Sequence, residues 1–336
     1  MAEGPAPGRV AVLSSSWGDA HDETAFATRA VAAAASRVVP VDVFVPGTPG
    51  PPRPDGAFDL QAVGGGGGWP AAADARWPAG GPFALAVVED GDEGALELAG
   101  RFLPQVPTVT VASGAGGPGD ARGVLAVGPG DDDPPTVGLH VPVHALAAAR
   151  RHVGLGFTGY LLVLTDRGPQ AARNDRPTPL VAWLAARFAG RHLVVVENAV
   201  ASVWRARSLR GLVAVDTRTD LWRLVAHAAA TVDLAPGGLF ARECVESLLY
   251  GVPVVVPAGT TGARLAALGG GLWFGDEAEL FGCVEALDDE RTRRALADQG
   301  KAVAGRWYGD ADGFVRRVAA ALDRRVGWPI GDGGPD

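Results

Sequence analysis

Residues 231–275 read TVDLAPGGLFARECVESLLYGVPVVVPAGTTGARLAALGGGLWFG, and this stretch decides the fold. The apolar run at 231–234 predicts a short β-strand, which the sequence Pro-Gly-Gly at 236–238 ends. From Leu239 to Tyr250 the apolar residues have the spacing of a helix that packs on a sheet. The run VPVVVP at 252–257 is typical of a buried parallel strand. The stretch therefore predicts a strand–helix–strand unit.

The start of this helix is expected to bind an anion. A helix that opens directly after a strand and a glycine pair directs its N–H groups and its positive dipole end into the crevice above the sheet. Gly237, Gly238, Leu239 and Phe240 occupy this turn, so we expect their backbone to accept a diphosphate.

Strands and helices alternate along the rest of the chain, which predicts an α/β protein with two Rossmann-like domains. We expect domain boundaries at 1–148 and 149–326, followed by a frayed tail at 327–336. The expected strands outside the central stretch are 9–15, 38–45, 58–63, 83–88, 108–112, 124–127, 137–144, 160–164, 192–197 and 212–215. The expected helices are 23–37, which Asp22 would cap, and 93–103, 180–189, 219–229, 277–287, 289–306 and 312–325.

Composition narrows the class of protein. The chain has 336 residues and a formal net charge of −8, and residues 1–150 hold 17 acidic and 8 basic side chains. An acidic half disfavours nucleic acid as a partner and disfavours docking of that half on anionic lipid. No signal segment or apolar run of 18 residues is present, so we expect a cytoplasmic protein. The abundance of Ala, Arg and Gly beside the single lysine, Lys301, resembles an actinobacterial composition.

The central stretch resembles the donor-binding half of GT-B glycosyltransferases, in particular the retaining family 4. The family pattern is Pro-Ser-x-x-Glu-Gly-Phe-Gly, followed by Glu-Ala-Met-Ala-x-Gly-x-Pro-Val-Val. The segment GGGLWFGDEAEL at 269–280 also resembles the segment that follows in the family. Phe240 matches the first pattern, and Pro236 provides a proline two positions after the one of that pattern. The residues that match the second pattern are Glu246, Gly251, Pro253, Val254 and Val255.

The resemblance implies a fold and an activity. It implies two Rossmann-like domains that face a cleft, an acceptor side formed by residues 1–148, and C-terminal helices that cross back. The activity would be sugar transfer from a UDP- or GDP-linked donor, with retention and without a metal or other cofactor. The acceptor would be a small molecule, a glycan or a lipid-linked molecule, and peripheral contact with a membrane is compatible with the last of these. Glu246 would accept hydrogen bonds from the ribose hydroxyls, because a carboxylate can take both donors of a vicinal diol.

The sequence departs from the family at three functional positions. Gly238 stands where the family has a glutamate against the donor sugar, and Glu243 is the candidate replacement. The family's phosphate-binding lysine is absent, and arginine can replace it because it binds phosphate bidentately. The middle loop also lacks the family's histidine, so His21 and His144 are the candidates beside the sugar. The arginine candidates for the diphosphate are Arg167 and Arg242, followed by Arg173 and Arg176.

Three other functions remain open. A catalytically inactive relative would keep the fold and bind nucleotide or serve as a scaffold, which the substitution at Gly238 favours. An epimerase of nucleotide sugars would need more carboxylates and histidines than the sequence offers. A dinucleotide oxidoreductase would need a GxGxxG motif after the first strand, and that motif is absent.

Overall fold

The computed structural model contains two compact units. The first comprises Met1–His140 together with Ala311–Asp336, and the second comprises Val141–Asp310. The chain therefore leaves the first unit once and returns to it with its last helix. The structure describes residues 8–17, 23–46, 59–63, 69–70, 83–89, 91–113, 124–127, 141, 158–165, 177–187, 192–196, 212–215, 221–234 and 241–326.

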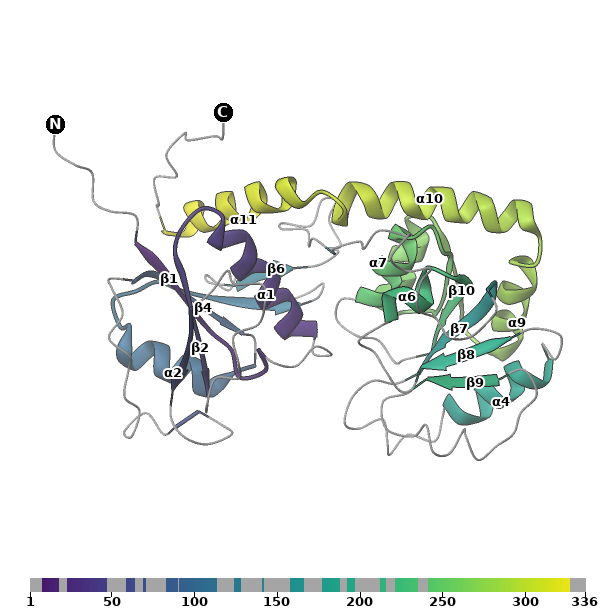
Figure 1. The fold of residues 1–336 in the computed structure, drawn as a ribbon, viewed down its shortest axis with the longest axis horizontal. Helices are drawn as coiled ribbons and strands as arrows, with labels where there is room; N and C mark the ends of the chain where they lie inside the picture. Colours follow the sequence, from purple (N-terminus) through teal and green to yellow (C-terminus); the bar gives the residue numbers. More distant parts are fainter. Residues whose placement is uncertain are drawn as a thin grey trace. The chain divides into compact units, whose positions relative to one another are not determined.

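The first unit is built on a six-stranded sheet in the order β3-β2-β1-β4-β5-β6, in which every described pairing is parallel (Figure 1). A buried parallel strand needs apolar side chains on both faces, and the sequence of β1, RVAVL, meets this need. The strands are β1 (Arg9–Leu13), β2 (Val41–Pro46), β3 (Asp59–Val63), β4 (Phe83–Glu89), β5 (Thr108–Ser113) and β6 (Val124–Val127).

Helices cover both faces of this sheet. Helix α2 (Glu93–Phe102) packs on one face, where Leu13, Val88 and Leu98 belong to one buried cluster. Helix α1 (Glu23–Ser36) contacts β2, β4 and β5, and α11 (Ala311–Val326) packs on α1. The last helix is thus a structural part of the first unit.

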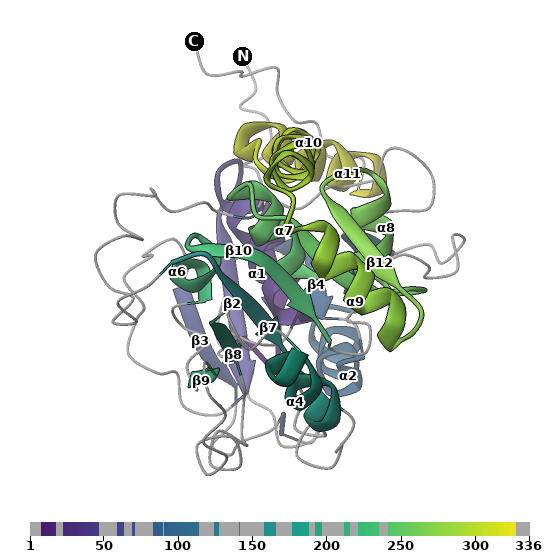
Figure 2. The same cartoon turned by 90° about the vertical axis from the view of Figure 1, so that its right-hand side faces the viewer.

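The second unit repeats the same topology. Its six-stranded sheet has the order β12-β11-β10-β7-β8-β9, again with parallel pairing throughout the described register (Figure 2). In both sheets the strand order reverses beside the first strand, between β1 and β4 and between β7 and β10. The strands are β7 (Tyr160–Leu164), β8 (Leu193–Val196), β9 (Leu212–Val215), β10 (Ala228–Asp233), β11 (Val254–Pro257) and β12 (Gly271–Phe274).

The helices of the second unit also lie on both faces of its sheet (Figure 2). One face carries α4 (Pro177–Arg187) and α9 (Glu277–Ala286). The other carries α6 (Leu221–Val225), α7 (Arg242–Leu249) and α8 (Thr261–Ala267).

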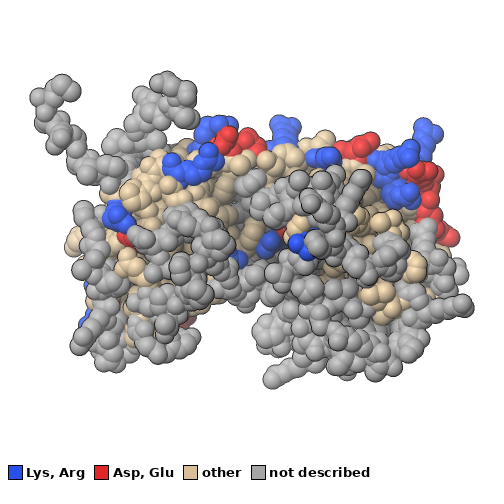
Figure 3. All heavy atoms as spheres, viewed as in Figure 1, with Lys and Arg blue, Asp and Glu red and all other residues tan. Residues whose placement is uncertain are grey.

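Helix α10 (Glu290–Tyr308) packs against α7 from outside. Asp289 caps it by accepting a hydrogen bond from the Thr292 N–H at 3.0 Å. Basic and acidic side chains are interspersed on its outer surface (Figure 3). One example is the exposed ion pair between Arg294 and Glu290, with 2.5 Å between Nη2 and Oε1.

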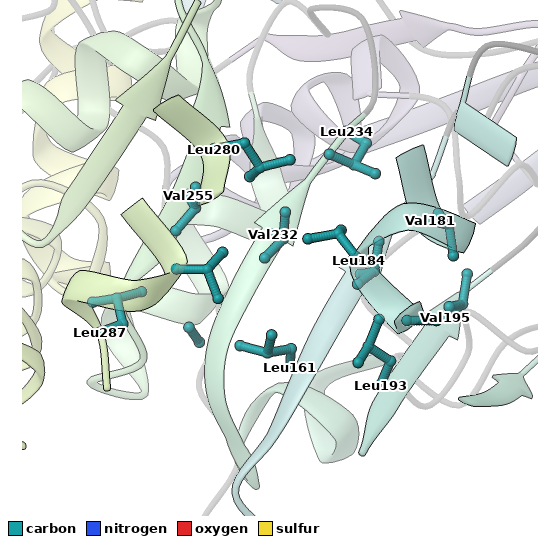
Figure 4. Close-up of a cluster of buried hydrophobic side chains, with 14 of the residues drawn as sticks. Leu161, Val181, Leu184, Leu193, Val195, Val232, Leu234, Val255, Leu280 and Leu287 are labelled. Atoms are coloured by element: carbon teal, nitrogen blue, oxygen red, sulfur yellow. The ribbon is translucent and has the colours of Figure 1, made fainter. Parts of the chain in front are cut away.

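A continuous apolar core joins the second sheet to α4 and α9 (Figure 4). Leu161, Leu193 and Val232 project from neighbouring strands, and Leu184 and Leu280 meet them from the two helices. Burying large aliphatic side chains contributes about 1.5–3 kcal/mol each, so this layer fixes the sheet that carries the candidate site.

The structure confirms most of the predicted elements, changes the bounds of two and adds two. The predicted helix at 219–229 ends at Val225, because Ala228 already belongs to β10. Helix α7 begins at Arg242 instead of Leu239. Helix α8 and strand β12 had not been predicted. Of the strand expected at 137–144 the structure describes Val141 alone, and Val141 is not in a strand. No helix among the described residues is long and apolar enough to span a membrane.

Candidate functional site

The candidate donor site lies at the carboxyl edge of the second sheet, where the strand order reverses. In open parallel sheets ligands bind at this position, because the loops on either side diverge to opposite faces. Here β7 ends at Leu164 and β10 ends at Asp233, and the two residues are partners in the strand register. The β10–α7 connection, whose sequence includes Pro-Gly-Gly at 236–238, leaves from this point.

Helix α7 opens with an unusual backbone conformation. Its N-cap, Ala241, has φ 50° and ψ 46°, and it is the only residue other than glycine with positive φ in the described part of the chain. Left-handed backbone costs a residue with a Cβ atom about 1–2 kcal/mol. A left-handed residue followed by helical residues turns successive N–H groups toward one point, which is a geometry that binds anions. Such strain is often found at ligand sites.

This conformation corrects the predicted start of the helix. The sequence predicted a helix from Leu239 that included Ala241 on its packed face. The left-handed turn at Ala241 interrupts any helical run that precedes it, so the N-terminal N–H groups are those of Arg242 and its successors. Ala241 is still buried, as its apolar character predicts.

Glu246 occupies the second turn of α7 and is buried, with 6% of its surface exposed. Glu246 is therefore not an exposed carboxylate on the surface of the helix. Its Oε1 accepts a hydrogen bond from Nε of Arg242 at 3.0 Å, and the two side chains form an ion pair one turn apart. A buried carboxylate needs a compensating charge or hydrogen-bond donors, and Arg242 provides both.

Polar contacts also join α7 to β10. The Ser247 hydroxyl lies 2.9 Å from the Thr231 hydroxyl and donates to the Glu243 carbonyl at 2.8 Å. Closer to the carboxyl edge, the Cys244 thiol lies 3.6 Å from Oδ2 of the buried Asp233. Glu243 is half-buried, and its Oε2 is shielded from solvent. The first turns of α7 are therefore held on the sheet by polar groups as well as by packing.

The corresponding edge of the first sheet carries a second polar cluster. The buried carboxylate of Glu89, at the end of β4, accepts hydrogen bonds from the hydroxyls of Ser14 and Ser16. The Ser15 N–H donates to Asp92 at 2.9 Å. Three successive residues after β1 are thus fixed by side chains that lie more than 70 positions away in the sequence.

Two further contacts complete this cluster. Asp92 caps α2 through the Ala95 N–H at 3.0 Å and accepts from the Trp69 indole N–H at 2.9 Å. Arg29 of α1 donates to the Trp17 carbonyl at 2.6 Å. Residues 14–17, the described part of the segment after β1, are therefore held in place where the strand order reverses, as expected of the start of a ligand-binding loop on a rigid scaffold.

The predicted site residues divide into two groups. Arg242, Glu243 and Glu246 come together on the first two turns of α7. His21, Arg167, Gly237, Gly238, Leu239 and Phe240 lie outside the described residues, as do Asp22, His144, Arg173 and Arg176. Their predicted roles stay predictions.

Sequence reasoning missed the polar groups at both sheet edges. Asp92 could have been found as the residue before a predicted helix, since aspartate is a preferred N-cap. Glu89 and Asp233 carry no such signal, because a carboxylate at the end of a strand is usually part of a solvated loop. The left-handed Ala241 could have been found from the family pattern, which has glycine at this position, because glycine adopts positive φ readily.

Comparison with known proteins gives the fold but no close relative. No protein-family model and no curated protein sequence matches the chain. Its structure is similar to that of HepE from Anabaena in complex with UDP-glucose, with a TM-score of 0.68 and 13% identity over 94% of this chain and 100% of that chain. Sucrose-phosphate synthase from Thermosynechococcus elongatus matches with a TM-score of 0.67 and 12% identity, covering 94% and 98% of the two chains.

A third similar structure is WaaG, a glycosyltransferase involved in lipopolysaccharide biosynthesis, with a TM-score of 0.59 and 14% identity over 97% of this chain and 100% of that chain. The similarity in each case extends over nearly the whole length of both proteins. With two Rossmann-like units of identical strand order, and with these structural neighbours, the chain has the GT-B fold of glycosyltransferases.

Proposed function

We propose that this protein is a glycosyltransferase that moves a sugar from a nucleoside-diphosphate sugar to an acceptor hydroxyl. The observation that carries the proposal is the buried carboxylate of Glu246, paired with Arg242, on the helix that begins at the carboxyl edge of β10. This is the position at which the motif resemblance expects the carboxylate that binds ribose. HepE has been crystallised with UDP and with UDP-glucose, which makes the uridine compounds the first donors to test.

The chemistry required of the site is mainly electrostatic. The bond between the anomeric carbon and the diphosphate oxygen breaks, and the acceptor oxygen forms the new glycosidic bond as its hydroxyl proton passes to the departing diphosphate oxygen. The charge that develops on the leaving diphosphate is stabilised by N–H groups, by a helix dipole and by cationic side chains. We propose that the backbone at Gly237–Phe240 and the start of α7 supply the first two, and that Arg167 and Arg242 supply the cations. We propose that this charge compensation serves in place of a metal.

The remaining roles follow from the same assignment. Glu243 and His21 are the proposed residues beside the donor sugar, in place of the glutamate that Gly238 replaces. The segment after β1, fixed by Glu89 and Asp92, is the proposed border of the acceptor site. We propose retention at the anomeric carbon, a cytoplasmic location, and a small-molecule, glycan or lipid-linked acceptor.

Nucleotide binding is the first test. UDP, GDP and UDP-glucose are titrated into the wild type and into the variant Glu246→Ala, with binding followed by calorimetry. Hydrogen bonds to a charged group contribute about 1.5–3 kcal/mol, so the variant should bind its preferred nucleotide roughly 10- to 100-fold more weakly. Glu285→Ala, which removes an exposed carboxylate of α9, is the matched control and should bind like the wild type. Equal affinity in Glu246→Ala and the wild type would exclude the ribose role.

Gly238 supports a second candidate, a catalytically inactive relative that binds nucleotide. Release of UDP from UDP-glucose, measured with and without mixed acceptor sugars, separates the two functions. Turnover that disappears in Glu246→Ala would establish an enzyme. Tight binding without turnover of any donor would favour the inactive relative.

A further inference from the structure

The pair formed by Arg242 and Glu246 is not explained by the stability of its helix. Arg242 is the first residue of α7, where the helix dipole is positive and disfavours a cation. An i, i+4 ion pair is also more favourable when the acidic residue precedes the basic one, and here the order is reversed. Neither the position nor the order of the two charges is what helix stabilisation would select.

Burial makes the arrangement more demanding. Glu246 has 7% of its side chain exposed and Arg242 has 29%, so both charges are largely removed from water. Desolvating two charges is costly, and a buried ion pair is often no more stabilising than apolar residues of the same size. The stability of helix α7 therefore does not account for this pair, which points to a role in binding a ligand.

We propose that Arg242 is a positioning residue for ribose recognition, and that it holds the Glu246 carboxylate in the orientation that accepts the ribose hydroxyls. This inference rests on the proposed function of the site. The guanidinium binds Oε1 of Glu246 through Nε, which restrains the side-chain torsions of the carboxylate. An ionised carboxylate has about four acceptor sites, so it can bind a guanidinium and also accept hydrogen bonds from hydroxyls. Discrimination in favour of a 2′-hydroxyl therefore depends on Arg242 as well as on Glu246.

A different role for Arg242 makes a different prediction. If its function were only to neutralise the diphosphate, its loss would weaken the binding of ribonucleotides and of 2′-deoxyribonucleotides by the same factor. If it positions Glu246, its loss weakens the ribonucleotide selectively. The ratio of the two affinities separates a contact with phosphate from the positioning of the carboxylate.

The experiment measures dissociation constants for UDP and 2′-deoxy-UDP by calorimetry, in the wild type and in variants at position 242. Arg242→Met keeps the length of the side chain without its charge. Arg242→Lys keeps the charge without the planar fork that fixes the carboxylate. Arg294→Met is the matched control, because it breaks another i, i+4 pair with glutamate, on the exposed surface of α10. Thermal unfolding of each variant reports its structural effect separately.

We expect the wild type to prefer UDP over 2′-deoxy-UDP by roughly 10-fold or more, the strength of a hydrogen bond to a charged group. The preference should fall below about threefold in Arg242→Met, be intermediate in Arg242→Lys, and be unchanged in Arg294→Met. If Arg242→Met folds and prefers UDP over 2′-deoxy-UDP as strongly as the wild type does, the inference is overturned, even if that variant is less stable. If Arg242→Met does not fold, an unchanged preference in Arg242→Lys overturns it.

The proposed function fails in a different way. If wild-type protein binds neither UDP, GDP nor UDP-glucose, the donor site itself is refuted, and the positioning role is refuted with it. If the wild type binds UDP but does not discriminate against 2′-deoxy-UDP, the donor site stands and the ribose role of Glu246, with its positioning by Arg242, is wrong.

Discussion

Replacement of Gly300 by alanine tests how closely α10 is packed against the helix that carries the candidate site. A Cβ atom built at Gly300 would lie 2.7 Å from Cδ2 of Leu248 and 2.9 Å from Cα of Gly270. Carbon atoms in contact are normally about 3.5–4.0 Å apart, so the methyl group needs a displacement of nearly 1 Å. Gly270 offers only backbone, so it cannot yield without moving the chain, whereas Cδ2 of the buried Leu248 can yield only by repacking against its neighbours.

Two opposing effects set the magnitude. Alanine is favoured over glycine inside a helix by about 1 kcal/mol. Overpacking a core costs about 1–3 kcal/mol. The cost at Gly300 should lie in the upper part of that range, because the new methyl group would meet two atoms, one of which belongs to the backbone. Gly300→Ala should therefore lose about 1–2 kcal/mol of unfolding free energy, and its melting temperature should fall by about 2–8 °C for a unit of this size.

Gly305→Ala is the matched control, because it lies on the same helix and its Cβ atom would meet nothing within 4 Å. This variant gains the helix-propensity term alone and should be more stable by up to about 1 kcal/mol. Urea denaturation and thermal unfolding of both variants measure the difference. If Gly300→Ala is as stable as Gly305→Ala, the close packing of α10 against α7 described here is wrong.

Three further predictions concern the first unit and buried phenols. Glu89→Ala should lower the free energy of unfolding in urea by about 2–3 kcal/mol, because it leaves two serine hydroxyls without their buried acceptor, and Glu89→Gln should lower it less. If Glu89→Ala is as stable as the wild type, the hydrogen bonds of this cluster are wrong. Arg9→Met should cost about 3 kcal/mol because it strands the buried Asp42 carboxylate, and adding Asp42→Leu should recover most of that loss in a double-mutant cycle. Burial raises the pKa of Tyr160 and of Tyr308 above the ordinary value, so the stability from these neutral phenols is present below about pH 10 and is lost as the pH rises further. Phenolate absorbance should show these two side chains ionising only as the protein unfolds, and reversible ionisation of all three tyrosines in folded protein would refute this.

Much of the fold could be predicted because its signals are local. The strands at 124–127, 160–164 and 212–215 have the predicted bounds, since a short apolar run leaves little choice of where the strand begins and ends. Gly251 ends α7 with φ 71°, as the position of a glycine after an apolar helix predicts. The candidate site was less predictable, because the burial of Glu246, the backbone conformation of Ala241 and the contacts of α7 with β10 depend on tertiary packing.

The sequence by itself determined the alternation of strands and helices, the placing of Glu246 on a helix, and the acidic character of the first half. Tertiary structure decided that Glu246 is buried, that a left-handed Ala241 starts its helix, and that Glu89 holds the hydroxyls of Ser14 and Ser16. The physical reason is range. Helical and strand periodicities arise between residues a few positions apart. Burial, and a hydrogen bond between residues 75 positions apart, depend instead on which strands are neighbours in the sheet.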